Sequence, residues 1–448
     1  MNKIMTLFAG IVFATAALAQ STDQLSGEWL LRREMFGQPW GFHRITFTVD
    51  KGKVTGTFAS GRKLEGTLEG NVLHFTSREG QGTIECTATI NGGAISGKFI
   101  ETNLDNARNV QESVITGARL PPPRSGPAQR HEFIPKTFYR EFSPLTPPVL
   151  HIWPGDTIHT TTVDAGGTDE RGVRRSFGGN PETGPFFIES TWPGDTLVIH
   201  FSRIRLNRDY AISDDGIVDR ALDSDMAVKM KDVGKTVRWH LDLERMIGTT
   251  ELPGDHLKNF SVPLRPMLGC VAVAPRLGSA SPSTTDSGRW GGNMDFNEIV
   301  EGVTVYLPVQ TPGALLYVGD GHAAQGDGEL NGDALETSME VEFTVQVISN
   351  KQSVTSATRF AATIRTPRVE SDSEIMTVGL GGSLEDALRE ATSGMSQWLE
   401  QDYGLAPSEI AQLLGTSVRL NINEAADRNA GVTARLSKQR LQALARKQ

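Results

Sequence analysis

The residues with the clearest chemical potential lie in a short glycine-rich segment in the second half of the chain. Residues 319–329 read Gly-Asp-Gly-His-Ala-Ala-Gln-Gly-Asp-Gly-Glu, directly after the apolar run Ala314–Val318. Glycines let a backbone approach a substrate or ion closely, because they lack a Cβ and tolerate positive φ. A turn alone would need neither His322, Gln325 nor Glu329. The segment therefore predicts a functional loop that is delivered by a strand.

Further acids and amides follow apolar or strand-like runs elsewhere in the chain. Together with the loop they give a set of strand-end polar groups: Asp164, Glu189, Asn293, Asp295, His322, Gln325, Asp327 and Glu329. Oxygen ligands with one imidazole suit Zn²⁺ or a similar divalent ion, and a purely structural Ca²⁺ loop is the alternative. A bound metal would acidify its water and polarise a carbonyl, while a nearby glutamate moved the proton.

Several other catalytic motifs are missing from the sequence. There is no Gly-x-Ser-x-Gly elbow, which argues against an α/β-hydrolase. Neither a His-Glu-x-x-His nor a Cys-x-x-Cys zinc motif occurs. Gly234-Lys235-Thr236 ends like a phosphate loop, but Lys229 stands where the first glycine belongs.

The first residues of the chain predict export. Residues 1–19 combine Lys3, an apolar core and the small-x-small sequence Ala17-Leu18-Ala19, which is typical of a signal peptide and of a secreted or periplasmic protein. No later apolar run reaches membrane-spanning length. The net charge of −9, with no basic stripe, argues against a nucleic-acid partner. The two cysteines, Cys86 and Cys270, are expected to be buried apolar residues rather than a disulfide framework.

Period-two alternation between glycine turns predicts an accessory antiparallel β domain over residues 20–118, folded as a small barrel or sandwich. Its aromatic residues Trp29 and Trp40 are expected in the core. The proline-rich residues 119–130 predict a linker.

Residues 131–448 predict a second domain, mainly β, whose C-terminal part (about 383–448) is helical. The motif Trp-Pro-Gly-Asp-Thr occurs at 153–157 and again at 192–196, each time as a turn before a strand. Ser383 and Asp386 predict a capped helix, and Pro407 predicts the start of another. The expected fold class is thus mainly β with C-terminal helices (α+β).

Five stretches of this second domain resemble the acetamidase/formamidase family. These are Gly291–Asp295 (Gly-Gly-Asn-Met-Asp), the glycine-rich loop 319–329, residues 184–197, residues 146–164 and the boundary Asp402–Leu405. The loop matches nearly word for word, and the resemblance extends over roughly residues 131–445.

The resemblance implies hydrolysis of a linear amide to a carboxylate and ammonia, in a β-rich fold with a metal-supported site and a homo-oligomeric assembly. Carried over by residue, it implies that the site is formed by Asp164, Glu189, Asn293, Asp295, His322, Asp327 and Glu329. From the chemistry of these residues we infer three sets of roles. The expected ligands of a divalent metal, Zn²⁺ or alternatively Ca²⁺, are Asp164, Asp295 and His322. The expected catalytic acids are Glu189, Asp327 and Glu329. Asn293 and Gln325 are expected to orient the amide substrate.

Two features of this chain, the predicted export and the additional N-terminal β domain, differ from the family and bear on the identity of the substrate. Because neither is expected of the family, the substrate is either an amide like formamide or acetamide or a larger one. The alternative is a periplasmic ligand-binding protein with a degenerate hydrolase fold. Since none of the matched acids nor His322 is replaced, an amidase is favoured over that binding module.

Overall fold

The structure, a computed structural model, describes residues 24–80, 82–103, 106–230, 233–252, 254–278, 280–350, 364–442 and 444. The chain divides into two compact units, with the boundary between Arg124 and Ser125 in the proline-rich stretch. The predicted signal peptide, residues 1–19, lies outside the described residues. Each unit has its own hydrophobic core.

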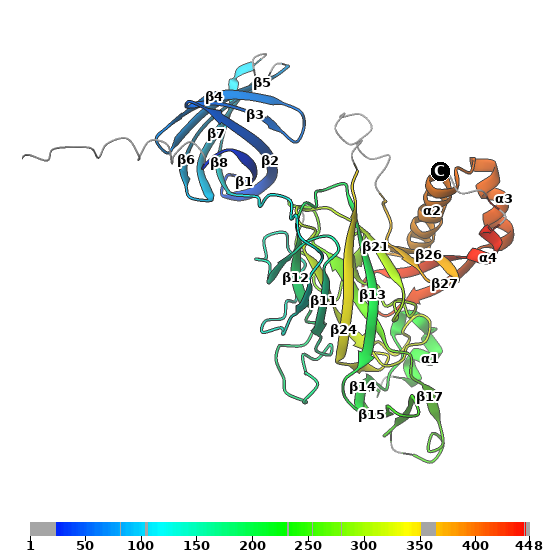
Figure 1. The fold of residues 1–448 in the computed structure, drawn as a ribbon. Coiled ribbons are helices and arrows are strands. Elements are labelled where there is room, and N and C mark those ends of the chain that lie inside the picture. Colours follow the sequence, from blue (N-terminus) through cyan, green and yellow to red (C-terminus); the bar gives the residue numbers. More distant parts are fainter. Residues whose placement is uncertain are drawn as a thin grey trace, which may run out of the picture. The chain divides into compact units, whose positions relative to one another are not determined.

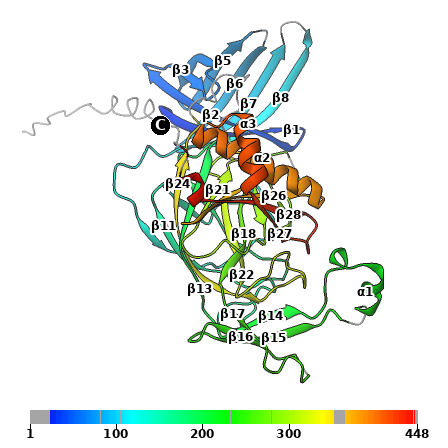
Figure 2. The same ribbon diagram turned by 90° about the vertical axis from the view of Figure 1, so that its right-hand side faces the viewer.

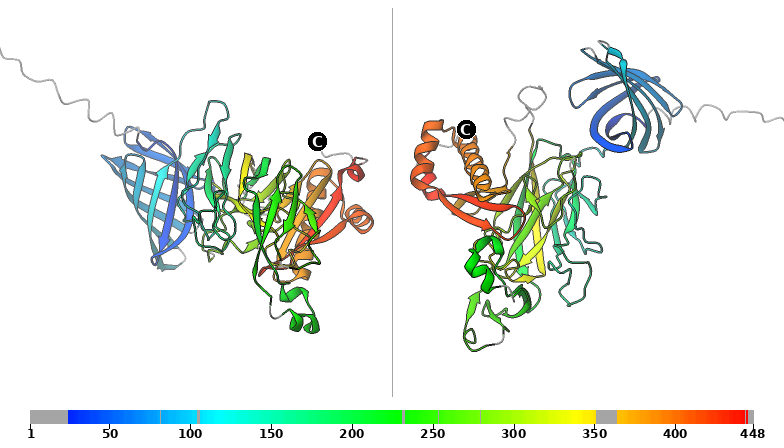
Figure 3. Two further views of the ribbon diagram at one scale, coloured as in Figure 1. Left: turned by 90° about the horizontal axis from the view of Figure 1, so that it is seen from below. Right: turned by 180° about the vertical axis from the view of Figure 1, so that it is seen from behind.

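The first unit is a closed antiparallel barrel, drawn in blue to cyan in Figures 1 and 3. In the described residues its strands are β1 (Gly27–Met35), β2 (Gln38–Asp50), β3 (Lys53–Phe58), β4 (Lys63–Glu69), β5 (Val72–Glu79), β6 (Gly82–Asn91), β7 (Ala94–Asn103) and β8 (Asn106–Arg119). Each strand pairs with the next one, and β1 also pairs with β8, which closes the barrel. The predicted antiparallel β domain is confirmed, in its barrel form.

The interior of the barrel is filled by alternate side chains of its strands. Trp29 is fully buried and its Nε1 donates to the carbonyl oxygen of Leu25 at 2.8 Å. Cys86 is also buried, as predicted. The prediction for Trp40 is wrong: its side chain is 66% exposed, because it stands beside the exposed turn at Phe36 between β1 and β2.

His43 is a titratable side chain enclosed by the barrel. Its ring packs edge-on against Phe58 and Phe99, with ring centroids 5.8 and 5.9 Å away. Burial, followed by the positive charge of Arg33, lowers the pKa of His43 to about 4. The native barrel therefore holds this imidazole neutral where an unfolded chain would protonate it.

We expect the barrel to lose stability as the pH falls from about 6.5 to about 4, because over this range the unfolded state binds a proton that the native state refuses. The loss is at most about 3 kcal/mol, from a pKa difference of roughly two units at 1.36 kcal/mol each. Urea unfolding of the full chain, followed by NMR of barrel methyl groups on both sides of this range, measures it. His43→Gln should remove the dependence and His74→Gln, at an exposed histidine, should retain it; equal pH profiles for the two variants would contradict the assignment.

The second unit contains two sheets. In the described residues the first has the order β27 (Arg419–Glu424), β28 (Ala430–Ser437), β26 (Glu374–Gly381), β25 (Arg368–Glu370), β21 (Thr304–Pro308), β13 (Thr196–Leu206), β24 (Met339–Ile348), β11 (Thr157–Thr161) and β9 (Arg130–Glu132). Strand β24 alternates between buried and partly exposed residues along most of its length, as expected for a strand with one face on a core.

The second sheet carries the candidate site. Its described strands follow the order β17 (Ser261–Pro263), β16 (Ile247–Thr250), β15 (Thr236–Asp242), β14 (Tyr210–Asp214), β23 (Glu336–Thr337), β22 (Leu316–His322), β18 (Met267–Val273), β20 (Gly291–Asn293) and β19 (Ser287–Gly288). A branch adds β12 (Thr183–Ile188), which pairs with β22, and β10 (Leu150–Ile152). Strands β14–β17 form an outer arm at one edge, labelled in Figure 2.

The main hydrophobic core lies between the two sheets. It joins Phe201 and Phe343 of the first sheet to Val271 and Val318 of the second. A smaller cluster that includes Cys270 and Tyr317 covers the other face of β18 and β22. Every residue of β18 and β22 is consequently buried, so the polar groups on these strands are shielded from solvent on both faces.

The predicted C-terminal helices are present. Helix α2 (Leu384–Tyr403) packs on β26 and β28 (Figure 2) and ends at Gly404, whose φ of 67° is a left-handed cap. Ser383 caps its first turn by accepting from the Asp386 N–H at 3.1 Å. The other described helices are α1 (Ser224–Lys229), α3 (Pro407–Ser417), α4 (Lys438–Leu441) and the 3₁₀ turn Asp219–Ala221. None of the helices in the described ranges is long and apolar enough to cross a membrane.

Candidate active site

The candidate site is assembled around β18, which lies between β20 and β22 in the second sheet. Met267 of β18 pairs with His322 at the end of β22, and Cys270 pairs with Asn293 at the end of β20. Asp295 follows β20 directly, so strand pairing brings the two sequence motifs, 291–295 and 319–329, side by side. As predicted, a strand leads into this segment: β22 ends at His322, and residues 323–329 follow it.

Gly269 in the middle of β18 makes room for two of the acids. A Cβ at this position would lie 2.3 Å from Oδ2 of Asp320 and 2.4 Å from Oδ1 of Asp295, closer than any real Cβ contact. The two carboxylates therefore occupy the space that a side chain at position 269 would fill. Substitution of Gly269 by any larger residue would push them apart.

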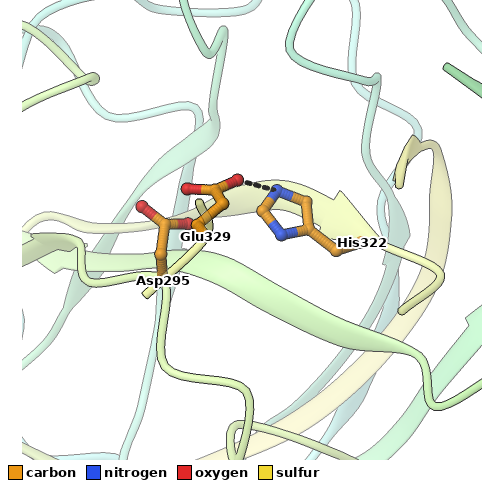
Figure 4. Close-up of side chains that lie close together, drawn as sticks. All are labelled: Asp295, His322 and Glu329. Carbon is orange, nitrogen blue, oxygen red and sulfur yellow. Dashed lines mark ion pairs between the residues drawn. The ribbon is translucent and has the colours of Figure 1, made fainter. Parts of the chain in front are cut away.

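Asp295, His322 and Glu329 lie close together, as Figure 4 shows, with ligand atoms within 4.8 Å of one another. Two further groups meet the same limit, Asp320 with His322 and Glu336, and Asp295 with Glu424 and Asp427. All of these side chains are buried except Asp427, which is partly buried. Carboxylates concentrated in this way repel one another unless protons or a cation neutralise them.

His322 is the imidazole shared by two of these groups. Its Nε2 lies 3.2 Å from Oε1 of Glu336, 3.5 Å from Oδ2 of Asp320 and 3.8 Å from Oε1 of Glu329. None of these contacts has hydrogen-bond geometry, so Nε2 is buried without a partner. Oδ1 of Asp295 and both carboxylate oxygens of Asp320 are likewise buried and unpartnered. Unpaired buried polar atoms are costly, and here they all converge on one place.

The proton affinities of the cluster reflect its burial. Desolvation, then the negative charge of Asp320, raises the pKa of Glu336 to about 8. Burial, followed by the neighbouring charges of Glu329 and Glu424, raises the pKa of Asp295. Burial alone would lower the pKa of His322, but Glu336 and Asp320 outweigh it and raise that pKa. A divalent cation could displace these protons, because its ligands are deprotonated when they bind.

The backbone is also unusual at the acids. Asp295, Asp320 and Glu329 have φ values of 42°, 54° and 47°. Residues other than glycine adopt this left-handed region at an energetic cost, and such strain concentrates at functional sites. The surrounding fold therefore holds these three acidic residues in backbone conformations that are unfavourable for non-glycine residues.

Gln325 and Asn293 orient this cluster from the side. Oε1 of Gln325 lies 2.8 Å from Nδ1 of His322, and its Nε2 donates to the backbone oxygen of Asp295 at 2.6 Å. Nδ2 of Asn293 donates to Oδ2 of Asp295 at 2.6 Å and to Oδ2 of Asp427 at 2.7 Å. The polar side-chain atoms of both amides are engaged within the protein, where they position His322 and the acids. Their expected role in orienting the amide substrate stays a prediction.

Asp164 is not one of the grouped ligands, contrary to expectation. Its Oδ2 accepts from Nη2 of Arg208 at 2.7 Å and its Oδ1 accepts from the Thr168 N–H at 2.8 Å. Both side chains of this ion pair are 2% exposed. Arg208 also donates to Oγ1 of Thr337, next to Glu336. The pair therefore supports the short strand β23 and engages both carboxylate oxygens of Asp164 away from the grouped ligands.

Glu189 and Asp327 also lie outside the groups of side chains around His322 and Asp295. The structure therefore does not bring these two expected catalytic acids together with Glu329. Glu189 follows β12, whose antiparallel pairing with β22 carries it toward Leu316, away from His322, and its Oε1 contacts Nδ1 of His151 at 2.7 Å. Asp327 is exposed, and its two oxygens accept from Asn297 and Asn421 at 2.9 and 2.8 Å. Those bonds tether the loop rather than provide a reactive acid.

Several members of the site were not identified from the sequence. They are Asp320, Glu336, Glu424, Asp427 and the fully buried Glu182, whose two carboxylate oxygens have no hydrogen-bond partner. Burial, and then Asp320, raises the pKa of Glu182. Asp320 lies within the glycine-rich loop 319–329. Glu424 is the last residue of β27, and a position at a strand end is the signal by which the predicted site residues were selected. Glu336 carried no such signal, because β23 is too short to be read from the sequence.

A cavity of about 360 Å³ opens beside the cluster. Glu329 and Gln325 contribute to its wall, so the cavity reaches the acids through Glu329. This arrangement provides a space next to a buried carboxyl group, which suits a hydrolytic site.

Comparison with known proteins agrees with this geometry. A model described as Acetamidase/Formamidase family matches residues 267–436, which include β18, β20, β22 and the loop. A putative formamidase of Schizosaccharomyces pombe is 39% identical over 61 residues, 13% of this chain and 15% of that protein, so the chain matches only a small part of that relative.

Two solved structures share the fold over much greater lengths. The acetamidase from Yersinia enterocolitica is 28% identical, with a TM-score of 0.58 over 71% of this chain and 94% of its own. A predicted acetamidase/formamidase from Thermoanaerobacter tengcongensis, 24% identical, gives the same TM-score over 71% of this chain and 99% of its own, and shows the fold alone. The family model thus matches the strands that carry the acidic cluster, and the second unit of the chain resembles acetamidase/formamidase structures over most of their length.

Proposed function

We propose that this protein hydrolyses the C–N bond of a linear amide, giving a carboxylate and ammonia, with the help of a divalent metal ion. The observation that carries the proposal is the convergence of unpartnered, buried carboxylate oxygens on the imidazole of His322, next to a cavity. The family match supports an amide hydrolase in general terms, and the metal and the amide class are parts of the proposal.

The residues fit a divalent cation. His322 and Asp320 would hold it, with Asp295 and Glu336 completing the set, because these side chains are buried and three of them carry atoms without a partner. Oxygen donors with one imidazole suit Zn²⁺, while Ca²⁺ would need more oxygens. When bound, such an ion lowers the pKa of a water molecule and polarises a carbonyl oxygen.

Gln325 prepares the imidazole for this task. Its contact with Nδ1 of His322 leaves Nε2 facing Asp320 and Glu336, which fixes the direction of the ring. Asn293 in turn holds the carboxylate of Asp295 and ties it to Asp427. These two amides thus preorganise the cluster before any substrate arrives.

Glu329 is the acid that moves the proton in this proposal. It lines the cavity, its Oε1 lies 3.8 Å from Nε2 of His322, and burial raises its pKa, which favours a role as proton carrier. A water molecule attacks the amide carbonyl carbon while Glu329 takes one of its protons. Glu329 then gives this proton to the amide nitrogen, the C–N bond breaks, and ammonia leaves. The carboxylic acid that remains passes the second proton of the water to ammonia or to solvent and becomes the carboxylate.

Removal of the metal is expected to abolish ammonia release by the full-length protein, because the acids would then hold protons instead of an ion. The measurement is ammonia release from short and aryl amides before chelation, after chelation, and after return of Zn²⁺ or Ca²⁺. Circular dichroism of the chelated protein controls for unfolding. Undiminished release from folded, demonstrably metal-free protein would overturn the metal, and no release from metal-loaded protein on any amide would overturn the amidase.

A further inference from the structure

The cavity beside Glu329 has a mixed lining. Glu329, Gln325 and Asn331 are its polar residues, and Trp239, Val262, Leu330 and Leu335 provide apolar surface. Glu329 is the single ionisable side chain among the described residues that line it. Apart from Glu329, the lining therefore offers no group that would pair with a charge on a substrate.

The apolar walls are held in place by the outer arm of the second sheet. Nε1 of Trp239, on β15, donates to Oγ of Ser213 on β14 at 3.0 Å, and the ring meets that of Phe260 edge-on at 6.5 Å. Leu335 belongs to a small core cluster that also contains Ala323, the residue after His322. The same packing thus connects the walls of the cavity to the acidic cluster.

The size of the cavity exceeds the needs of the smallest amides. Its volume of about 360 Å³ falls in the range of roughly 300–1,000 Å³ that is typical of sites for larger organic ligands. Acetamide carries a single methyl group and would leave the walls at Trp239 and Val262 in contact with water. An apolar acyl group that displaced this water would gain binding energy from the hydrophobic effect.

We propose that the preferred substrate is a neutral primary amide whose acyl group is aromatic or branched, with that group packed against Trp239, Val262 and Leu335 and the amide at Glu329. This inference rests on the proposed amide hydrolysis and adds to it the substrate class. Trp239 acts as a specificity-determining residue because it adds a large apolar surface to the cavity from β15, a different strand than those that carry the acids.

The first test compares kcat/KM for phenylacetamide and for acetamide in the metal-loaded, full-length protein. We expect phenylacetamide to be preferred by at least about tenfold, the scale of discrimination that an apolar pocket provides. Trp239→Ala should lower this preference by roughly tenfold. The matched control is Trp40→Ala, at an exposed tryptophan of the barrel, which should leave the preference unchanged.

A second variant and a binding measurement separate this inference from the proposed function. Val262→Phe should fill the cavity and also lower the preference, which covers the case that Trp239→Ala fails to fold. Calorimetry with each amide gives a readout that is independent of turnover. Tighter binding of phenylacetamide that is lost in the variants, without hydrolysis, would uphold the pocket and overturn the amidase.

The remaining outcomes are equally decisive. Hydrolysis of both amides with similar kcat/KM in every protein would uphold the amidase and overturn the pocket. Neither hydrolysis nor stronger binding of phenylacetamide would overturn both.

Discussion

The His322→Ala variant is expected to lose amide hydrolysis by about 10²–10⁴-fold in kcat/KM, the range that a positioned acid–base or ligand group typically contributes. The imidazole is the single nitrogen donor among the grouped ligands and faces Asp320, Glu329 and Glu336 within 3.8 Å. Its removal leaves these carboxylates without the group on which they converge. Ammonia release and bound-metal content, measured on the same preparation, test this result.

A matched histidine controls for general effects of the substitution. His200 lies on β13 of the same unit, is exposed and contacts Oγ1 of Thr304, so His200→Ala should retain activity and metal. Thermal unfolding of both variants shows whether the fold is kept. Normal turnover in folded His322→Ala protein would contradict the site, whatever the metal content.

The Arg208→Leu variant is expected to destabilise the second unit by about 3–5 kcal/mol, because it leaves the buried carboxylate of Asp164 without its counter-ion. Both partners are 2% exposed, and Arg208 donates in addition to Thr337 and to the backbone oxygen of Tyr210. Urea unfolding of the full chain, followed through signals of this unit, gives the loss. A change under about 1 kcal/mol would contradict the structural role of the pair.

Two further variants show which interactions of Arg208 cause the loss of stability. Arg205→Leu removes an exposed arginine of β13 that is paired with Glu301, and an exposed pair contributes only about 0–1 kcal/mol. Arg208→Leu combined with Asp164→Leu should recover part of the stability, because no buried charge then lacks a partner. Failure of the double variant to recover would assign the loss to the other contacts of Arg208.

The local part of the site could be predicted from the sequence. His322, Gln325 and Glu329 lie within one glycine-rich loop, and their residue types exceed what a turn requires. Asp295 was accessible through its own short motif. Sequence patterns of this kind report on a few neighbouring residues, and the structure indeed places these four together.

The rest of the site depends on contacts between distant parts of the chain. Asp164 follows a strand as Asp295 does, but its partner Arg208 is 44 residues away and cannot be identified from a pattern. Glu189 was selected for its place after a strand, and the antiparallel direction of β12 put it at the wrong end of β22. Strand ends predict a site only when the relative directions of the strands are known.

The same limit applied to the fold. The alternation of short strands predicted a barrel or sandwich, and the choice between them rested on the pairing of β1 with β8 across most of the first unit. Helices α2 and α3 were predicted with their first residues, because capping and proline signals are local.

The order of strands in the second sheet implies an uneven distribution of local stability. Backbone amides of β18 and β22, buried on both faces, should exchange with deuterium only when the whole unit opens, whereas β16 and β17 at the edge should exchange through small fluctuations. The acidic cluster belongs to the slow region, and Val262 on β17 belongs to the fast one. We therefore expect a ligand to enter through local movement of the outer arm (β14–β17), while the strands that carry the carboxylates keep their pairing.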